Sequence, residues 1–336
     1  MSAAAALEGF AAEVGTDGAV RVVGGRTQWD VGGPPSGEAR ELEAPTGVVD
    51  IAPDEMTVRV RAGTPLATLE AELREVGQRV ALHGDLGATV GGVLAVGRSG
   101  VRRLGDGPVR DALLEARVVT AEGRLVTAGG PTVKNVSGFD LPRLLVGSLG
   151  TLALIAEVIL RTRPIPVATV WRSGEIDPFV LLDSMYRPTS VLWDGRTTWA
   201  CLEGEDDDVA EQILVAASLG LHRDSAGPPP LPAGRRSVAP SRLRELARPS
   251  PPVLAVKPGA SRPGTTARTE WGAAARHLGD FVAEVGVGIV HGNLGDETAP
   301  AHDPPAEPLR RLHDRLKASF DPSGRLNPGR SPLRAR

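Results

Sequence analysis

The chain has 336 residues, of which 41% are hydrophobic and 24% charged, and its formal net charge is −3. This length allows roughly two or three domains with a sizeable core, and the nearly balanced charge gives no reason to expect nucleic acid or an acidic membrane surface as a partner. The single cysteine, Cys201, excludes an internal disulfide and a multi-cysteine metal or iron–sulfur site.

The N-terminal sequence MSAAAALEGF lacks a basic region and reaches Glu8 too early for a secretory signal. No stretch of the chain approaches the roughly 20 apolar residues that a membrane-spanning helix needs. We therefore expect a cytoplasmic protein that does not itself insert into a membrane.

The first part of the chain alternates predicted strands and helices. A short apolar strand at residues 20–23 stops at a Gly-Gly pair, and residues 57–63 alternate with the period of a strand. A helix is predicted to start from Thr64 as N-cap with Pro65 at its first position, and to stop at Gly77. Its apolar face would consist of Leu66, Leu69, Leu73 and Val76.

Two further β elements follow before the composition changes. Residues 116–128 predict a hairpin with its turn at Glu122-Gly123, and the apolar, β-branched run LALIAEVILRTRPIP predicts a strand that ends at Pro164 and Pro166. Beyond Pro166 we expect a second hairpin, with its turn at Asp194-Gly195, and a helix with an acidic first turn.

Prolines crowd the next region, where a short Arg-rich helix is predicted at 241–247. Order returns with TEWGAAARHLGDFVAEVG, which fits a helix or a strand followed by a helix, and with the strand VGIVHGN. An amphipathic helix carrying Leu309, Leu312, Leu316 and Phe320 comes last. We accordingly divide the chain into a first domain at 1–166, a small α/β cap at 167–225, a proline-rich connection at 226–267 and a C-terminal segment at 268–336.

Several common signatures are missing from the sequence. No G-x-G-x-x-G follows a strand, and no lysine lies in a G-x-x-x-x-G-K-[ST] pattern, so a Rossmann dinucleotide fold and a P-loop are not expected. The histidines show neither H-E-x-x-H nor any paired metal spacing, so we expect no metal site.

Glycine-rich clusters carry the strongest chemical signal. They lie where a predicted strand meets a turn or helix, and include GGRT after the first strand, GATVGGVLAVGRSG from Gly87 to Gly100, and VGSLGTL from Val146 to Leu152. Glycines let backbone N–H groups approach a phosphate, and nearby hydroxyls add donors. The alternative is a set of ordinary tight turns, since 41 residues are glycine.

The order of the sequence motifs along the chain favours phosphate binding over ordinary tight turns. Five motifs follow one another along the chain: VRVVGGRTQWDVGG, VRAGTPLATLEAELREVGQ, GATVGGVLAVGRSG, VKNVSGFDLPRLLVGSLGTLALIAEVILRTRP and FDPSGRLNPGR. This series resembles the PCMH-type FAD-binding domain of the vanillyl-alcohol-oxidase superfamily, over residues 15–166 and about 268–330. Within that superfamily it is similar to the smaller FAD-binding subunit of bacterial glycolate oxidase, through VKNVSGFDL, EWGAAAR and the short length.

The resemblance implies an α+β fold in which a two-part FAD-binding domain carries a small, reduced α/β cap. It also implies which glycine-rich turns bind FAD: the first holds the pyrophosphate, the second lines the diphosphate and flavin, and the third passes near the adenosine half. The expected cofactor-binding residues are Gly24, Gly25, Arg26, Thr27, Gln28, Ala88, Thr89, Gly91, Gly92, Gly97, Ser99, Gly100, Gly150, Thr151, Leu152 and Ile155.

Some members of the superfamily bind flavin covalently through a histidine in the first glycine turn. That turn is GGRTQ here, so we expect dissociable FAD. Larger relatives that oxidise 2-hydroxy acids hold a metal with paired histidines and a glutamate, whereas IVHGNLGDE offers His291 without a neighbouring partner. The terminal Asn327 and Arg330 are expected to dock the terminus on the first domain.

Three residues are candidates for catalysis, each with an alternative. Lys134 near the flavin would stabilise its reduced anion, or pairs with a carboxylate. Glu270, with its neighbour Trp271, would lie at the flavin or at a domain seam, or belongs to a structural helix. His291 is the candidate in the shortened metal region, or is a lone surface or core histidine. Asp140 is expected only to cap the helix that starts after it.

The expected function is FAD-dependent oxidation of a small 2-hydroxy acid such as glycolate or D-lactate. Since one cysteine cannot hold a cluster, electrons would leave through an iron–sulfur subunit, with a larger flavin subunit as a second partner and membrane association only through partners. Two alternatives stay open: a stand-alone FAD oxidase of alcohols or sugars, and a non-catalytic subunit that serves as scaffold or electron conduit.

Overall fold

The computed structural model describes residues 3–85, 87–130, 140–247, 280–292 and 307–334. Contacts divide the chain into two compact units, one formed by Met1–Ile165 with Pro304–Arg336 and the other by Pro166–Asp303. Each unit combines helices with a mainly antiparallel sheet, which confirms the expected α+β class. No helix among these residues is long and apolar enough to cross a membrane.

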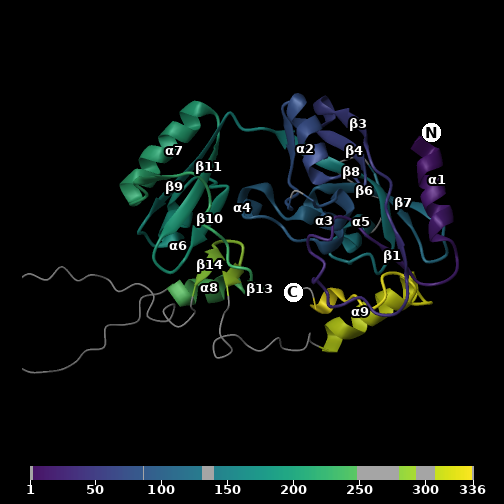
Figure 1. Ribbon diagram of the computed structural model, residues 1–336. Helices are drawn as coiled ribbons and strands as arrows, with labels where there is room; N and C mark the ends of the chain where they lie inside the picture. The colour runs from purple at the N-terminus through teal and green to yellow at the C-terminus, as the bar shows by residue number, and fades with distance from the viewer. Residues whose placement is uncertain (1–2, 86, 131–139, 248–279, 293–306, 335–336) are drawn as a thin grey trace, which may run out of the picture. The chain divides into compact units, whose positions relative to one another are not determined.

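The first unit is built on a sheet of six strands around β8, Leu154–Pro164 (Figure 1). β8 pairs antiparallel with three strands, and most of its side chains are buried because both faces of the strand are covered. The sheet runs in the order β3-β4-β8-β6-β7, with β5 paired to β8 beside this path. Its other strands are β3 (Val48–Ala52), β4 (Thr57–Arg61), β5 (Gln78–Val80), β6 (Leu113–Val119) and β7 (Leu125–Gly129).

Helix α2, Leu66–Glu75, buries Leu66, Leu69 and Leu73 of its predicted apolar face, and Gly77 adopts the expected left-handed conformation at φ +67°. Val76, the fourth residue predicted for that face, is exposed at the C-cap position. The expected N-cap is wrong. Pro65 occupies the cap position, while the Thr64 hydroxyl donates to the carbonyl of Arg61 and accepts from the N–H of Gly47. Thr64 therefore ties β4 to a neighbouring turn instead of capping the helix.

Helix α5, Leu141–Leu145, begins after Asp140 as expected. The Asp140 side chain makes no capping hydrogen bond and instead pairs with Arg143 at 2.7 Å. The remaining elements of this unit are α1 (Ala3–Val14), β1 (Val20–Val22), β2 (Arg40–Leu42), α3 (Val90–Val96), α4 (Arg103–Asp106) and α9 (Glu307–Phe320), with short 3-10 turns at Pro53–Glu55, Val109–Asp111 and Pro332–Arg334.

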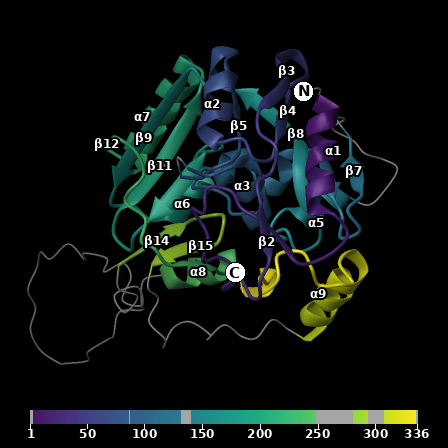
Figure 2. The same ribbon diagram turned by 45° about the vertical axis from the view of Figure 1, so that its right-hand side comes forward.

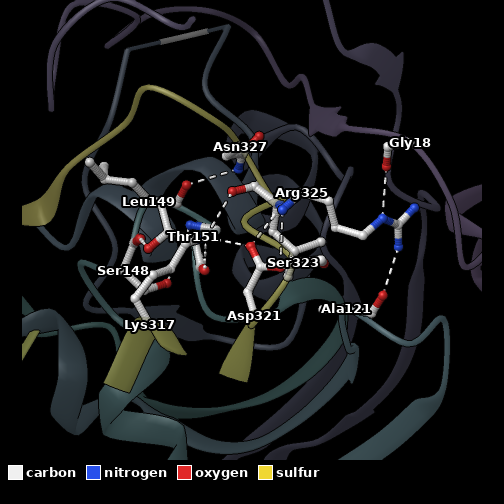
Figure 3. A network of polar contacts seen from close by, with 12 residues as sticks. Gly18, Ala121, Ser148, Leu149, Thr151, Lys317, Asp321, Ser323, Arg325 and Asn327 are labelled. Carbon is white, nitrogen blue, oxygen red and sulfur yellow. Dashed lines mark hydrogen bonds and ion pairs between the residues drawn. The ribbon is translucent and has the colours of Figure 1, made fainter. Parts of the chain in front are cut away.

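The chain returns to the first unit through α9 and the segment that follows it. Leu326 bridges Val20 in parallel beside β1, which itself pairs in parallel with β2. Figure 3 shows the polar network that anchors this return: Arg325 reaches main-chain carbonyls near the N-terminus, and Lys317 donates to the carbonyl of Thr151 at 2.8 Å. The hydrogen bonds of Arg325 thus join residues more than 300 positions apart in the sequence.

The second unit contains a seven-stranded sheet in the order β12-β9-β11-β10-β14-β15-β13. Its hairpin turns at Asp194-Gly195 as predicted, and α7 lies along β9 and β11 (Figure 2). Its elements are β9 (Ala168–Gly174), α6 (Pro178–Ser184), β10 (Ser190–Trp193), β11 (Thr198–Gly204), α7 (Asp206–Leu219), β12 (Arg223–Ser225), β13 (Arg235–Ser237), α8 (Pro240–Ala247), β14 (Phe281–Glu284) and β15 (Ile289–Gly292).

Two expectations about this unit need correction. The proline-rich stretch is more than a connection, since β13 within it pairs with β15 at the sheet edge. Phe281–Glu284 forms a strand rather than the end of a helix, because every one of its side chains is buried between sheet neighbours on both sides.

Candidate cofactor site

The described part of the first unit holds a pocket with an open volume of about 980 Å³, counting space continuous with solvent. Its walls come from parts of the sequence that lie far apart. The turn after β1 supplies residues 24–29, the start of α3 supplies a second wall, and Leu149 with Gly150 supplies a third. Asn327 and Arg330 from the returning C-terminal segment complete the lining.

The two main glycine-rich turns pack directly against each other at this pocket. A Cβ on Gly25 would lie 1.5 Å from the carbonyl oxygen of Gly87, and one on Gly24 would lie 2.4 Å from the hydroxyl of Thr89. Gly91 approaches Ala62 in the same way, since a Cβ on it would lie 2.8 Å from the alanine methyl group. Glycine is required here because a side chain would separate the two walls.

Thr89 positions the second turn through the helix that follows it. Its backbone is extended, at φ −102° and ψ 153°, and its hydroxyl accepts from the N–H of Gly92 at 3.2 Å, which caps α3. Gly97 ends the same helix in the left-handed conformation, at φ +69°. The backbone at the start of α3 is thus fixed at the pocket wall.

Arginines dominate the charge of the pocket wall. Arg21, Arg26 and Arg330 all line it, and Trp29 lies between two of them, with the guanidinium carbons of Arg26 and Arg330 at 4.7 and 4.5 Å from the ring centroid. Arg330 also donates to the main-chain carbonyls of Trp29, Val31 and Gly33. These contacts fix one guanidinium and one indole beside the first glycine turn.

Two buried polar atoms of lining residues have no hydrogen-bond partner. They are Nε of Arg21 and Oε1 of Gln28. A buried polar atom without a hydrogen-bond partner costs folding free energy. The wall is therefore suited to a ligand that supplies an acceptor for Nε of Arg21 and a donor for Oε1 of Gln28. A long group that carries phosphates, such as FAD, fits this combination of guanidiniums, unpaired polar atoms and glycine backbone.

The structure brings most of the expected cofactor residues to this one pocket. They come from the first glycine turn, the start of the second turn and α3, and the start of β8 with the turn before it. The expected residues that line the pocket are Gly24, Gly25, Arg26, Thr27, Gln28, Ala88, Thr89, Gly91, Gly92, Gly150 and Ile155.

The other expected cofactor residues lie outside this lining. Gly97 packs on the backbone of Gly147, the Ser99 hydroxyl accepts from the N–H of Val109, and Gly100 packs on the ring of His83. The Thr151 hydroxyl donates to the carbonyl of Ser148, and Leu152 is buried.

Sequence reasoning missed several residues of this wall. Trp29 lies within the first glycine-rich motif but was not predicted to bind the cofactor. Arg21 was predicted only as part of a strand. Asn327 was expected to dock the terminus, yet it also lines the pocket: its side chain accepts from the N–H of Val22 and donates to the carbonyl of Leu149. The only sequence signal for Asn327 was the NPGR motif near the end of the chain.

Among the catalytic candidates, His291 lies in the second unit on β15. Its Nε2 is 2.7 Å from Oε1 of Glu284 on β14, and both side chains are largely buried. The other oxygen of Glu284 is buried without a hydrogen-bond partner. Lys134 and Glu270 lie outside the described residues. Among the residues that are described, no group of three or more His, Cys, Asp or Glu side chains could hold a metal.

Comparison with known proteins places this pocket in a family context. Residues 10–129 match the model of the FAD binding domain family. The glycolate oxidase subunit GlcE of Escherichia coli (strain K12) is 30% identical over 328 residues, which cover 92% of this chain and 91% of GlcE.

Other similarities are more limited in extent. The glycolate oxidase subunit GlcD of Bacillus subtilis (strain 168) is 40% identical over 134 residues, 40% of this chain and 28% of GlcD. A solved structure of alkyldihydroxyacetonephosphate synthase superposes with a TM-score of 0.53 at 18% identity. That match covers 67% of this chain and about half of the synthase chain, 51%, and supports the fold.

Proposed function

Since the chain belongs to the family of FAD-binding oxidoreductases that includes the glycolate oxidase subunit GlcE, we propose that it oxidises a small 2-hydroxy acid, such as glycolate or D-lactate, within a multi-subunit complex. FAD bound in the pocket of the first unit supplies the hydride acceptor for this reaction. The observation that carries the proposal is the convergence of the expected glycine turns and three arginines on that pocket.

We place the cofactor by chemistry that this chain provides. The backbone of Gly24, Gly25 and the start of α3 would contact the diphosphate, because glycines let N–H groups approach it closely. Gln28 and Asn327 would supply hydrogen bonds to the polar parts of the ligand. The first glycine turn contains no histidine, so the flavin would be held without a covalent bond.

The partners follow from what the chain lacks as well as from its relatives. GlcE and GlcD are both named as subunits of glycolate oxidase. With Cys201 as its single cysteine, this chain cannot hold an iron–sulfur cluster of its own. We therefore propose a larger flavin subunit and an iron–sulfur subunit as its partners.

The test is anaerobic reduction of the bound flavin by a panel of 2-hydroxy acids, with and without co-expressed partner subunits. We expect glycolate or D-lactate to bleach the flavin absorbance of the complex. Flavin that no 2-hydroxy acid reduces in the complex would contradict the proposal, and turnover of alcohols or sugars by the isolated chain would favour a stand-alone oxidase.

A further inference from the structure

The charges on the pocket wall are all of one sign. Arg21, Arg26 and Arg330 line it, and no acidic side chain is among the described lining residues. Acidic groups are nearby but set back from the lining: Glu41 on β2 and Asp30 beside Arg330. A wall of this kind attracts an anion, and a low-dielectric setting strengthens the attraction.

Arg21 is a largely buried cation of this wall. Its side chain is 12% exposed, its Nε is buried without a hydrogen-bond partner, and its ion pair with Glu41 is long, at 3.5 Å. Burial, and then the nearby charge of Arg21, hold the pKa of Arg330 below its usual value, while Asp30 acts in the opposite direction. Arg21 and Arg330 are thus close enough to repel, and an anion between them would relieve that repulsion.

Glu41 is the present counter-ion of two wall arginines. Its Oε2 is 2.6 Å from Nη2 of Arg26, and its Oε1 is 3.5 Å from Nη1 of Arg21. β1 and β2 pair in parallel with Arg21 directly opposite Glu41, so the strand register fixes the carboxylate there. Arg26 itself has a left-handed backbone, at φ +54°, which projects its side chain from the glycine turn.

We propose that Arg21, Arg26 and Arg330 form an anion subsite for the cofactor's diphosphate, and that Glu41 is an internal competitor which the diphosphate displaces from Arg26. The inference rests on the assignment of FAD to this pocket and extends it to Arg21, Arg330 and Glu41, which lie outside the glycine turns. Glu41 keeps the arginines paired before the cofactor arrives, and it weakens cofactor binding to the extent that the ion pair must be broken.

Calorimetric titration of the flavin-free full chain with FAD, ADP, adenosine and riboflavin tests this inference without any measurement of turnover. We expect Glu41→Gln to bind FAD and ADP about three- to tenfold more tightly, a range set by the modest strength of half-exposed ion pairs. The affinity for adenosine and riboflavin, which carry no phosphate, should change less than twofold in the same variant. Arg21→Met should weaken the binding of FAD and ADP at least tenfold and leave the affinity for adenosine nearly unchanged.

Glu43→Gln is the matched control, because Glu43 is exposed just beyond β2 and its removal changes the net charge equally. In an Arg26→Met background the gain from Glu41→Gln should disappear, since the competing pair is already broken. Weaker or unchanged ADP binding in Glu41→Gln, or a gain equal to that of Glu43→Gln, would overturn the competitor role. If Arg21→Met lost equal affinity for ADP and for adenosine, the proposed anion subsite would be overturned. Failure of every variant and the parent to bind FAD would instead refute the cofactor pocket itself.

Discussion

Gly25 packs against Gly87 so closely that a methyl group at position 25 would lie 1.5 Å from the Gly87 carbonyl oxygen. Gly25→Ala must therefore separate two pocket walls, and we expect a loss of about 3 kcal/mol of unfolding free energy together with at least tenfold weaker FAD binding. Urea denaturation and flavin titration measure the two effects. Gly87→Ala is the control: its Cβ meets only the Thr27 methyl group, at 3.5 Å, and should change little.

The side chain of Arg325 is the main anchor of the C-terminal segment. It donates to the carbonyls of Val14, Gly15, Asp17, Gly18 and Ala121, and the residue is only 5% exposed.

Arg325→Met removes all five of these hydrogen bonds, and we expect it to lower the unfolding free energy by about 3–5 kcal/mol. Arg325→Lys should recover only part of this, because an ammonium cannot reproduce the guanidinium fork. Arg124→Met, at an exposed ion pair with Glu122, should change stability by less than about 0.5 kcal/mol. A wild-type urea midpoint for Arg325→Met would contradict the anchoring role.

Asp321 makes the C-terminal anchor sensitive to acid. Burial of its carboxyl opposes ionisation, but hydrogen bonds from Lys317 and from the N–H groups of Leu326 and Arg325 outweigh it and hold the pKa below its usual value. A depressed carboxyl pKa stabilises the fold above the unfolded value of about 3.9, and the contribution is lost as pH falls through the folded value.

We therefore expect Asp321→Asn to be less stable than the parent by about 1–3 kcal/mol at neutral pH. Thermal melts between pH 7 and pH 2 should show this difference narrowing below about pH 4. Asp314→Asn, at an exposed position of α9, the helix that ends just before Asp321, should change stability much less than Asp321→Asn at neutral pH. A constant gap between Asp321→Asn and the parent would contradict the assignment.

The absence of histidine from the first glycine turn gives a direct prediction about the cofactor. Acid precipitation should release all of the flavin into the supernatant, because GGRTQ offers no imidazole for a covalent bond. The absorbance of the supernatant and pellet measures the partition. Yellow colour that stays with the denatured polypeptide would show a covalent link and contradict the prediction.

Local signals in the sequence were enough for most of the fold. The apolar spacing of Leu66, Leu69 and Leu73 predicted α2, and the Asp194-Gly195 turn predicted the β10–β11 hairpin. The prediction that Thr64 caps α2 was wrong because the carbonyl of Arg61, three residues before it, and the N–H of Gly47, 17 residues before it, engage its hydroxyl instead. Strand β13 was missed because prolines usually indicate a loop, and only its pairing with β15 makes it a strand.

The cofactor pocket was predictable where its chemistry is local and not where it depends on long-range contacts. The glycine turns could be found because glycine spacing is visible in the sequence itself. The stacking of Arg330 on Trp29 joins residues about 300 positions apart, and no local pattern predicts such a contact. Arg21 was missed for a similar reason, since a strand residue becomes part of a pocket only once its neighbours are known.

The return of the C-terminal segment has a consequence for how the protein is made. The sheet around β8 lies within the first 165 residues, but Asn327 and Arg330 are added to the pocket only after the second unit has been synthesised. A nascent chain therefore carries an incomplete cofactor site while its second unit is being made. Cleavage before Leu326 would remove Asn327 and Arg330 from the pocket lining and leave that part of the wall incomplete.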